Sequence, residues 1–457
     1  MAVTASGDGQ TWSSGWTFIL ASVGAAVGLG NIWKFPYVVG TEGGGAFVLV
    51  YLVAVVFVAI PILIAEIVVG RRGGTSPPVA MATVAERAGR STRWAIVGWM
   101  GLIAGYLITS YYSVIAGWTL AYIVKAGTGF GGAAAAEVAA QFDTLQSDPQ
   151  TMTLWHTAFM ILSVFIVGRG LQAGIEKTVK LLMPALFAIL VVMIGYAAIE
   201  GDFKAGWDFL FNADFSKIDG GAVLTAIGQA FFSIGVAMGL MMAYGAYVPR
   251  DVSLTRSAII VAIADTVVAL LAGLMIFPIV FANGLNPAEG PSLIFRTLPT
   301  AFVEMQGGVI FGALFFLLLA FAAVTSLIAL INPIVQYSQD KWDWSRKKGA
   351  MVFGALSWFI GLATVMSFNA WANVTPLASF ETFASMTPYD LIDYFTANIL
   401  MPVGGMLIAL FVGWRLDTRK LADELSFGSQ AMFVGWLWMI RVVAPLGILA
   451  VLYSTFA

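Results

Sequence analysis

Residues 23–34 read VGAAVGLGNIWK, a glycine-rich stretch that contains a polar asparagine. It lies inside an apolar run from about residue 16 to residue 40, which is long enough to cross a membrane. Gly24, Gly28 and Gly30 fall near the middle of that run, beside the polar Asn31. Small residues at this depth are common where membrane helices pack closely, but glycines also allow a helix to break.

A second stretch of the same kind reads SIGVAMG at residues 233–239. The first stretch opens the chain and the second opens its second half, five apolar runs later. Paired glycine-rich interruptions at corresponding positions indicate a transporter built from inverted repeats, with the binding site between them. An unwound turn leaves backbone N–H and C=O groups that lipid cannot pair, so a carboxylate and a hard cation such as Na⁺ are suitable partners.

Composition sets the class of protein. Of 457 residues, 60% are hydrophobic and 11% are charged, against roughly 45–50% and 25% in soluble domains. The net charge of −2 gives no basic face for nucleic acid. The chain has no cysteine and one histidine, so haem-thiolate, iron–sulfur and zinc sites lack their ligands. We therefore expect a polytopic protein of the lipid bilayer that is not an enzyme and binds no nucleic acid.

Eleven apolar runs can be counted in the sequence, and each is expected to be a transmembrane helix. They fall at about residues 16–40, 45–70, 95–125, 153–168, 174–199, 221–247, 257–283, 307–338, 349–369, 389–414 and 429–456. We expect a single transporter domain over residues 1–457. Its parts would be a first repeat at about 16–199, a second at about 221–414 and an extra helix at about 429–456. The Gly/Ala-rich residues 127–151 are expected to form a solvated loop.

Basic residues predict the orientation, because short connections rich in Lys and Arg stay in the cytoplasm. Most Lys and Arg fall in alternate connections, for example Arg71 and Arg72 after the second run. The opposite connections hold only Lys204, Lys217 and Arg296, with Lys125 near an interface. We therefore predict a plasma-membrane protein with a cytoplasmic N-terminus and an extracellular C-terminus.

Several polar side chains are expected at membrane depth, where they are costly and usually functional. A single Ser or Thr there can also simply bond to a carbonyl of its own helix. Asp265 is harder to explain in that way. The set is Asn31, Glu66, Ser233, Asp265, Thr325 and Ser326.

Long, ordered motifs then connect the chain to a known family. Residues 22–36, SVGAAVGLGNIWKFP, resemble the neurotransmitter:sodium symporter family, whose bacterial members have the leucine-transporter fold. Further matches are GGGAF at 43–47, EIVVGRRGG at 66–74, YY at 111–112, GQAFFS at 228–233, AAVTS at 322–326 and DYF at 393–395. The resemblance implies an all-α transporter with a 5+5 inverted repeat and discontinuous first and sixth helices. It is similar in appearance to bacterial carriers of several hydrophobic amino acids.

The resemblance also implies two sodium sites. The first would be formed by the Ala26 carbonyl, Asn31, Ser233, Asp265 and the substrate carboxylate. The second would be formed by the carbonyls of Gly24, Val27 and Ala322 and the hydroxyls of Thr325 and Ser326. Shells made only of oxygen suit a hard cation.

An amino-acid substrate is implied in the same way. Its carboxylate would meet the Leu29 and Gly30 amides and the Tyr112 hydroxyl, and its amine would meet the carbonyls of Ala26, Phe232 and Ser233. The pocket for its side chain would be lined by Ile108, Phe232, Gly235, Met238, Ser326 and Leu330.

Departures from the family pattern refine this picture. Gly28 stands where monoamine carriers have an Asp, so an amino acid with its own carboxylate is the better substrate. Gly235 and Met238 replace a Ser and a Phe of the leucine-selective relative, which favours large apolar side chains. Chloride-dependent relatives use a Ser where this chain has Ala269, and Asp265 replaces the usual Asn. We therefore expect chloride independence, with proton antiport through Asp265 or Glu66 an open alternative.

Gating residues are implied as well. Lys34 and Asp393 match an extracellular pair, although Lys lacks the bidentate fork of Arg. Trp12 and Asp340 match residues of the cytoplasmic gate, whose usual N-terminal Arg is absent. Gly174 and Pro184 match the motif at which the fifth span unwinds.

The sequence thus predicts a sodium symporter that imports aliphatic and aromatic L-amino acids by alternating access. The alternatives are a non-transporting amino-acid sensor, a carrier for another small zwitterion, a channel and a membrane-embedded enzyme. The channel is disfavoured because no repeated filter sequence is present. The enzyme is disfavoured because no metal triad, nucleophile elbow or catalytic carboxylate pair is present.

Overall fold

The structure of the chain, a computed structural model, describes residues 11–290 and 292–456. All regular elements in these residues are helical. The first half contains α1 (Gly15–Ala26), η1 (Gly30–Lys34), α2 (Phe35–Thr41), α3 (Gly45–Ala54), η2 (Val55–Ala59), α4 (Ile60–Gly73), α5 (Pro77–Arg87), η3 (Thr92–Trp94), α6 (Ala95–Gly127), η4 (Gly129–Gly132), α7 (Ala135–Ser147), α8 (Pro149–Gly168), η5 (Leu171–Glu176), α9 (Lys177–Glu200) and α10 (Phe203–Phe211).

The second half begins at the connection before the second glycine-rich stretch. It contains η6 (Phe215–Lys217), α11 (Gly220–Ile234), α12 (Leu240–Gly245), α13 (Leu254–Ala282), η7 (Leu293–Thr297), α14 (Leu298–Glu304), α15 (Gly308–Trp342), α16 (Arg346–Ser367), η8 (Glu381–Phe383), α17 (Pro388–Tyr394), η9 (Phe395–Leu400), α18 (Met401–Arg415), α19 (Thr418–Leu425), α20 (Gln430–Trp438), η10 (Met439–Val443) and α21 (Ala444–Phe456).

Both predicted interruptions are present. The first span is bent by 48° between α1 and the continuous segment formed by η1 and α2. The second is divided into α11 and α12, with the non-helical residues 235–239 between them. The breaks fall in the two glycine-rich stretches that the sequence singled out.

The number of spans depends on how these breaks are counted. Nine helices in the described residues are long and apolar enough to cross a membrane, and a tenth span results if the bent pair is taken as one. The divided segment does not qualify, because α11 has 15 residues and α12 has 6. The count of eleven therefore stays a prediction.

The expectation of a solvated loop at residues 127–151 was wrong. Residues Ala135–Ser147 form the helix α7. Val138, Phe142 and Leu145 recur at helical spacing, and all three are buried. This apolar stripe gives the Ala-rich segment a face to pack, which the composition alone did not reveal.

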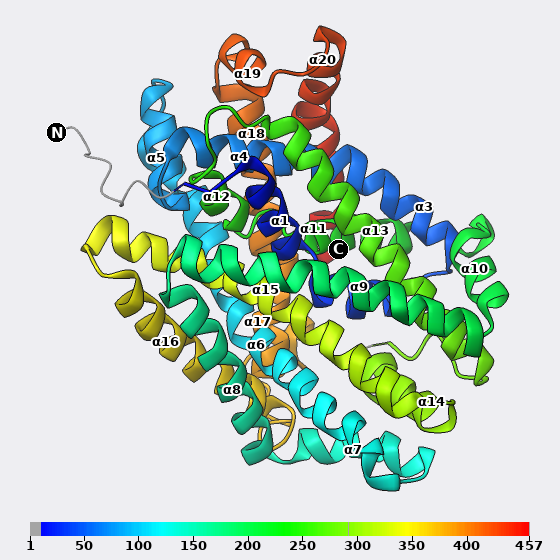
Figure 1. Cartoon of the computed structure of the whole chain (residues 1–457). Coiled ribbons are helices and arrows are strands. Elements are labelled where there is room, and N and C mark those ends of the chain that lie inside the picture. The colour runs from blue at the N-terminus through cyan, green and yellow to red at the C-terminus, as the bar shows by residue number, and fades with distance from the viewer. Residues whose placement is uncertain (1–10, 291, 457) are drawn as a thin grey trace.

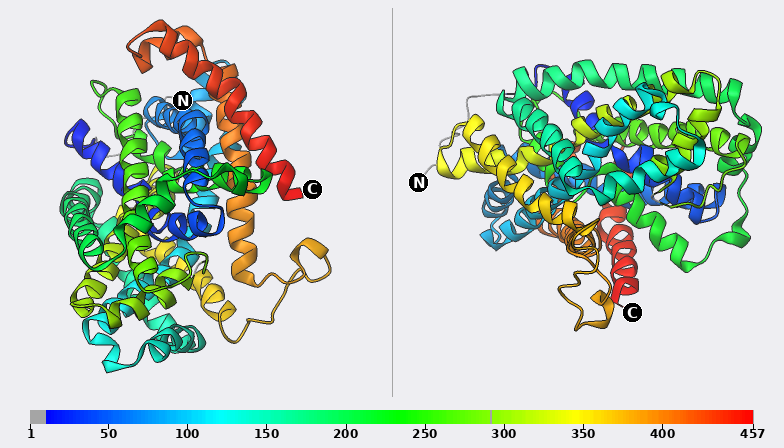
Figure 2. Two further views of the ribbon diagram at one scale, coloured as in Figure 1. Left: turned by 90° about the vertical axis from the view of Figure 1, so that its right-hand side faces the viewer. Right: turned by 90° about the horizontal axis from the view of Figure 1, so that it is seen from below.

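The broken helices lie at the centre of the molecule. Figure 1 shows α1, α11 and α12 near the middle, with the long α15 passing beside them. The helices α6 and α15 pack against each other, and α15 also contacts α1 and α12. Figure 2 shows the C-terminal helix, in red, on the outside of the bundle beside α18, a contact that the packing confirms. The interruptions are therefore enclosed by unbroken helices.

The outer helices present apolar side chains outward. Leu154, Ile161 and Phe165 on α8 are at least 60% exposed, and Leu181 on α9 is 70% exposed. In water such a surface would be unfavourable, whereas a bilayer solvates it. The buried interior and the apolar exterior together indicate a protein that sits in lipid.

Candidate functional site

Side-chain hydrogen bonds, two of them from other helices, stabilise the break in the first span. The Leu29 N–H donates to the Tyr112 hydroxyl at 3.0 Å, and the Gly28 N–H donates to Asn31 Oδ1 at 3.1 Å. Gln229 Nε2 donates to the Gly30 carbonyl at 3.1 Å. The first two bonds satisfy N–H groups that the missing helical turn would otherwise leave bare, and Gln229 adds a second donor to the Gly30 carbonyl, which also accepts from the Phe35 N–H.

The second break depends on left-handed backbone. Gly235, Ala237 and Gly239 have φ of 72°, 64° and 73°. For Ala237 this conformation costs about 1–2 kcal/mol, because its Cβ crowds the following carbonyl oxygen. Its N–H donates to Glu66 Oε1 at 2.9 Å. Glu66 lies on α4 and is fully buried, so one carboxyl group from a neighbouring helix fixes the strained turn.

A cluster of polar side chains, the first oxygen cluster, joins the two breaks. Asn31 Nδ2 lies 2.7 Å from Asp265 Oδ1 and 3.0 Å from Ser233 Oγ. Ser233 Oγ donates to Asp265 Oδ2 at 2.7 Å and lies 3.3 Å from the Tyr51 hydroxyl. Asn31, Ser233 and Asp265 are all at most 1% exposed. The structure thus brings together the three side chains that were expected at the first sodium site.

The chemistry of the first oxygen cluster fits a cation. Both Asp265 oxygens receive hydrogen bonds from neutral groups only. A buried carboxylate is costly unless a positive charge compensates it. The ion pairs within 4.0 Å among the described residues do not include Asp265. Ser233 and Asp265 present oxygens that suit Na⁺, whereas Asn31 turns its Nδ2 toward them and would ligate the ion through Oδ1 only after its amide has rotated.

A second oxygen cluster lies between α1 and α15. Ser326 Oγ is 3.5 Å from the Gly24 carbonyl and 3.4 Å from the Val27 carbonyl. Thr325 Oγ1 lies 3.0 Å from the Ala322 carbonyl. Ser326 therefore connects α15 to the end of α1, whereas the Thr325 hydroxyl bonds carbonyls of its own helix, and Thr325 Cβ lies 3.2 Å from the position that a Cβ on Gly24 would occupy. All oxygens of this second cluster are uncharged, in contrast to the first oxygen cluster.

A small cavity adjoins the second oxygen cluster at Ser326 and is lined by Gly30 and Phe232, the chain neighbours of Asn31 and Ser233 in the first. Its volume is about 30 Å³, roughly the share of one water in the liquid. It includes nine of the eleven residues expected at the substrate site, and Leu29 and Ser233 lie outside its lining. The residues that line it are Ala25, Ala26, Gly28, Gly30, Ile108, Tyr112, Phe232, Gly235, Met238, Leu240, Ser326 and Leu330.

Sequence reasoning missed Leu240 on this wall. It follows the second break directly, and it lies 3.5 Å from the position that a Cβ on Gly235 would occupy. Gly28 has no room for a side chain, because an added Cβ would be 2.5 Å from Ser326 Oγ and 2.8 Å from the Tyr112 hydroxyl. A side-chain carboxylate therefore cannot stand at this position without rearrangement.

Phe232 separates the small cavity from a larger one. It also lines a neighbouring cavity of about 390 Å³, whose wall includes Lys34. Lys34 Nζ lies 4.2 Å from the centroid of the Phe232 ring, a cation–π contact. Lys34 and Asp393 are not among the ion pairs within 4.0 Å of the described residues. The expected outer pair is thus apart in this structure.

At the opposite end, Trp12 is inserted into the core. Its Nε1 donates to the Tyr244 carbonyl at 3.0 Å, and its ring packs edge-on against the Tyr244 ring with centroids 5.1 Å apart. Asp340 accepts a hydrogen bond from the Ser76 N–H at 2.7 Å. Trp12 therefore closes the end of the bundle through the broken helix, and Asp340 binds a different segment.

Arg346 is a residue of this region that sequence reasoning treated only as a sign of orientation. Its guanidinium donates to the Val167 carbonyl at 2.9 Å and to the Asn332 side chain. It begins α16 and connects the end of α8, at Val167, to Asn332 in the second half of α15. No local pattern marked it, since its partners lie far away in the sequence or inside an apolar run.

The fifth span starts with a π-helical turn, and the unwinding expected at Gly174 and Pro184 stays a prediction. Gly174 lies in the π-helical turn η5, and a Cβ there would be 2.0 Å from the Ile166 carbonyl oxygen. Pro184 lies inside α9. Glu176, in the same turn, accepts from the Ser13 N–H at 3.2 Å and pairs with Lys180 at 2.6 Å. This turn therefore contacts the segment that leads into α1.

Comparisons with known proteins agree with this architecture. The family model of the sodium:neurotransmitter symporter family matches residues 9–130 and 141–457. An uncharacterised sodium-dependent transporter of Bacillus subtilis is 35% identical over 444 residues, covering 96% of each chain. A similar transporter of Haemophilus influenzae is 33% identical over 97% of this chain and 98% of its own.

A solved structure is also similar. The crystal structure of MhsT in complex with L-phenylalanine superposes with a TM-score of 0.90 at 39% identity, over 98% of this chain and all of that one. The chain belongs to the sodium:neurotransmitter symporter family. The predicted family and all-helical fold are thereby confirmed, and membership in a family of transporters agrees with the expectation that the chain is not an enzyme.

The bond between Glu66 and Ala237 can be tested by substitution. Glu66→Ala leaves a buried N–H without an acceptor, which should cost about 1–3 kcal/mol and lower the melting temperature of the purified protein. Glu66→Gln keeps an acceptor oxygen and should retain most of the stability. Equal losses in the two variants would show that the charge, and not the hydrogen bond, matters.

Proposed function

We propose that the protein is a secondary transporter that couples the import of hydrophobic L-amino acids to Na⁺. The observation that carries this proposal is a buried carboxylate, Asp265, that has only neutral partners, Asn31 and Ser233, whose chain neighbours Gly30 and Phe232 line a small cavity with largely apolar walls. A bound cation would compensate the negative charge of Asp265, and the apolar walls favour a substrate with an apolar side chain. The MhsT structure supports the substrate class, because that relative is bound to L-phenylalanine.

Two sodium ions are proposed, one in each oxygen cluster. In the first, the substrate carboxylate would complete the shell formed by Ala26, Asn31, Ser233 and Asp265. Each of sodium and substrate then raises the affinity for the other, and this coupling is necessarily reciprocal. In the second, only neutral oxygens of α1 and α15 surround the ion, so it would tie the first span to α15.

The substrate would be held by its charged ends and selected by its side chain. The Leu29 and Gly30 amides and the Tyr112 hydroxyl would receive the carboxylate, near the positive end of the η1–α2 segment. The cavity of about 30 Å³ is far smaller than the roughly 150 Å³ that accepts a benzene ring. Substrate entry therefore requires the walls to move. Phe232 is the natural moving part, since a second cavity lies behind it.

In alternating access, the outer and inner ends of the binding centre would open and close in turn. Lys34 and Asp393 would close the outer end above Phe232, and Trp12 with Tyr244 would release the inner end. Sodium favours whichever arrangement it binds more tightly, so its loss to the cytoplasm would permit release. Unwinding at Gly174 and Pro184 would open the path from the second oxygen cluster.

The proposed location is the plasma membrane, with the N-terminus in the cytoplasm and the C-terminus outside. The distribution of Lys and Arg supports this orientation. A non-transporting amino-acid sensor remains the alternative, since it would need the same binding centre. Transport into vesicles separates the two.

The substrate class is tested by competition. Uptake of labelled phenylalanine into proteoliposomes should be inhibited by leucine, isoleucine, tryptophan and methionine, and not by aspartate or lysine, because the pocket walls carry no charge. The uptake should be lost when potassium replaces sodium. Binding without uptake in the same vesicles would favour the sensor, and equal inhibition by charged amino acids would refute the proposed pocket.

The sodium sites are tested by two substitutions, one in each cluster. Asn31→Ala and Thr325→Ala each remove an oxygen ligand and should raise the sodium concentration for half-maximal substrate binding at least tenfold, about 1.4 kcal/mol. The measurement is a sodium titration of labelled phenylalanine binding. Thr364→Ala, on the buried side of α16 away from both clusters, serves as the control. Unchanged sodium dependence in both test variants would overturn the site map.

Chloride dependence is tested by replacing chloride with gluconate. Asp265 supplies a fixed negative charge, and Ala269 offers no hydroxyl, so uptake should be unchanged. The variant Asp265→Asn removes the charge and should reduce uptake in both buffers. Loss of wild-type uptake in gluconate would contradict the proposed chloride independence.

A further inference from the structure

A broad hollow lies away from the transport centre, and its lining is strongly basic. It is formed by the ends of α4 and α5, the connection between α12 and α13, and the α18–α19 segment, and its volume is about 1180 Å³. Seven cationic side chains and three carboxylates line it, an excess of four positive charges. The upper part of Figure 1 shows α5 and α19 at this end of the molecule.

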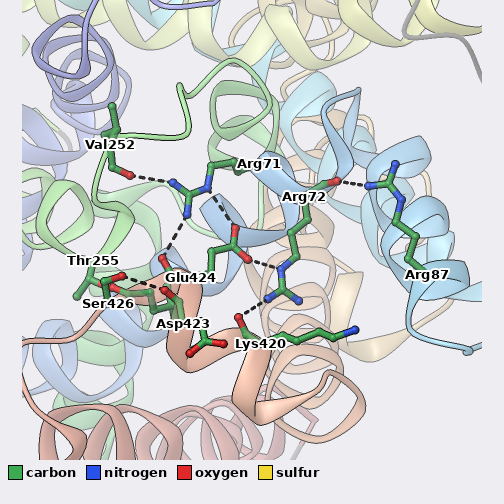
Figure 3. A network of polar contacts seen from close by, with 10 residues as sticks. Arg71, Arg72, Arg87, Val252, Thr255, Lys420, Asp423, Glu424 and Ser426 are labelled. Carbon is green, nitrogen blue, oxygen red and sulfur yellow. Dashed lines mark hydrogen bonds and ion pairs between the residues drawn. The ribbon is translucent and has the colours of Figure 1, made fainter.

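One carboxylate in the hollow, Glu424, forms ion pairs with two of the arginines. Arg71 Nε lies 3.1 Å from Glu424 Oε1, and Arg72 Nε lies 2.5 Å from Glu424 Oε2. Figure 3 shows the two guanidinium groups approaching Glu424 from α4. Arg71 also donates to the Val252 carbonyl at 2.8 Å, and Thr255 donates to the Leu425 carbonyl at 2.8 Å. This network fixes α19 against α4 and the start of α13, so the wall of the hollow is rigid.

Within the part of the chain that the structure describes, the remaining five cations of the hollow have no carboxylate oxygen within 4.0 Å. The ion pairs within 4.0 Å among the described residues include none of Arg87, Arg90, Arg250, Arg415 and Lys420. All five are exposed. Arg87 and Arg90 each donate one hydrogen bond to a backbone carbonyl, of Arg72 and Arg415, which leaves their other N–H groups available.

The three carboxylates, Asp417, Asp423 and Glu424, offset only part of this charge. Glu424 is shared by two arginines, and Asp417 Oδ1 accepts from the Arg419 N–H at 2.8 Å and the Lys420 N–H at 3.3 Å, where it caps α19. Retention of positive loops explains why cations lie on this face, but not why seven of them line one hollow with only three carboxylates. Such an arrangement suits an anion with several oxygens.

We propose that the hollow binds a phosphate group. Guanidinium groups match phosphate oxygens with paired hydrogen bonds, and clusters of Lys and Arg beside membrane helices attract anionic lipids. The short helix α19 buries Leu421 and Leu425 in the bundle and exposes Arg419 and Lys420, so its cationic side faces outward. The phosphate would come from an anionic phospholipid of the cytoplasmic leaflet or from a soluble phosphorylated compound. The cytoplasmic source rests on the orientation proposed above.

The test compares two pairs of substitutions that change the charge equally. Arg90→Gln with Arg415→Gln removes two cations of the hollow. Lys177→Gln with Lys347→Gln removes two exposed cations elsewhere on the same predicted face. Native mass spectrometry of the purified chain measures the binding of phosphatidylglycerol and of phosphatidylcholine, and calorimetry measures the binding of inorganic pyrophosphate. Melting temperatures establish that all variants are folded.

Wild type should bind phosphatidylglycerol or pyrophosphate. The variant with Arg90→Gln and Arg415→Gln should bind the same probe about thirtyfold more weakly, because each lost cation removes about 1 kcal/mol of binding free energy. The control variant should stay within about twofold of wild type. Binding of the lipid alone identifies a headgroup site, and variant-sensitive binding of pyrophosphate identifies a soluble source.

Three outcomes would overturn the proposal: equal binding of the anionic and the zwitterionic lipid without pyrophosphate binding, equal weakening in the control variant, or no binding of either phosphate probe. The measurements use neither sodium nor amino acid. A negative result in these binding measurements would therefore not contradict the proposed transport. A negative transport result would likewise not contradict phosphate binding in the hollow.

Discussion

The structure depends on pairing the bare peptide groups of two broken helices inside a bundle that excludes water. Each break removes helical hydrogen bonds, and in lipid an unpaired backbone group costs several kcal/mol. Tyr112, Gln229 and Glu66 supply partners from α6, α11 and α4. The surrounding helices therefore contribute hydrogen bonds as well as packing, and these bonds stabilise the non-helical backbone of the two breaks.

This constraint explains why polar residues concentrate where they do. Asn31 bonds the backbone of its own break and also contacts Ser233 beside the other break. The two interruptions are thus connected by one buried network, with Asp265 at its end. A change in any member alters the energy of both breaks. Binding and conformation are coupled here because the same groups serve both.

Sequence reasoning located the breaks because glycine clusters at mid-span are a local signal. The first observed interruption lies within residues 23–34, and the second lies within residues 233–239. Most of the cavity lining followed from the family resemblance, which places residues that no periodicity could bring together. The contacts of Glu66 with Ala237 and of Arg346 with Asn332 and Val167 were missed. They join distant segments, so no local pattern contains them. The helix α7 was missed because composition was weighed above the spacing of Val138, Phe142 and Leu145.

The contrast between the two oxygen clusters has an electrical consequence. The first contains the carboxylate of Asp265, whereas the second contains only neutral oxygens. With two sodium ions and a zwitterion bound, an ionised Asp265 would leave the loaded centre with one net positive charge, and the empty centre with one negative charge. A potential that is negative inside then drives the loaded form inward and the empty form outward. For each charge crossing the full field this amounts to about 2.3 kcal/mol per 100 mV.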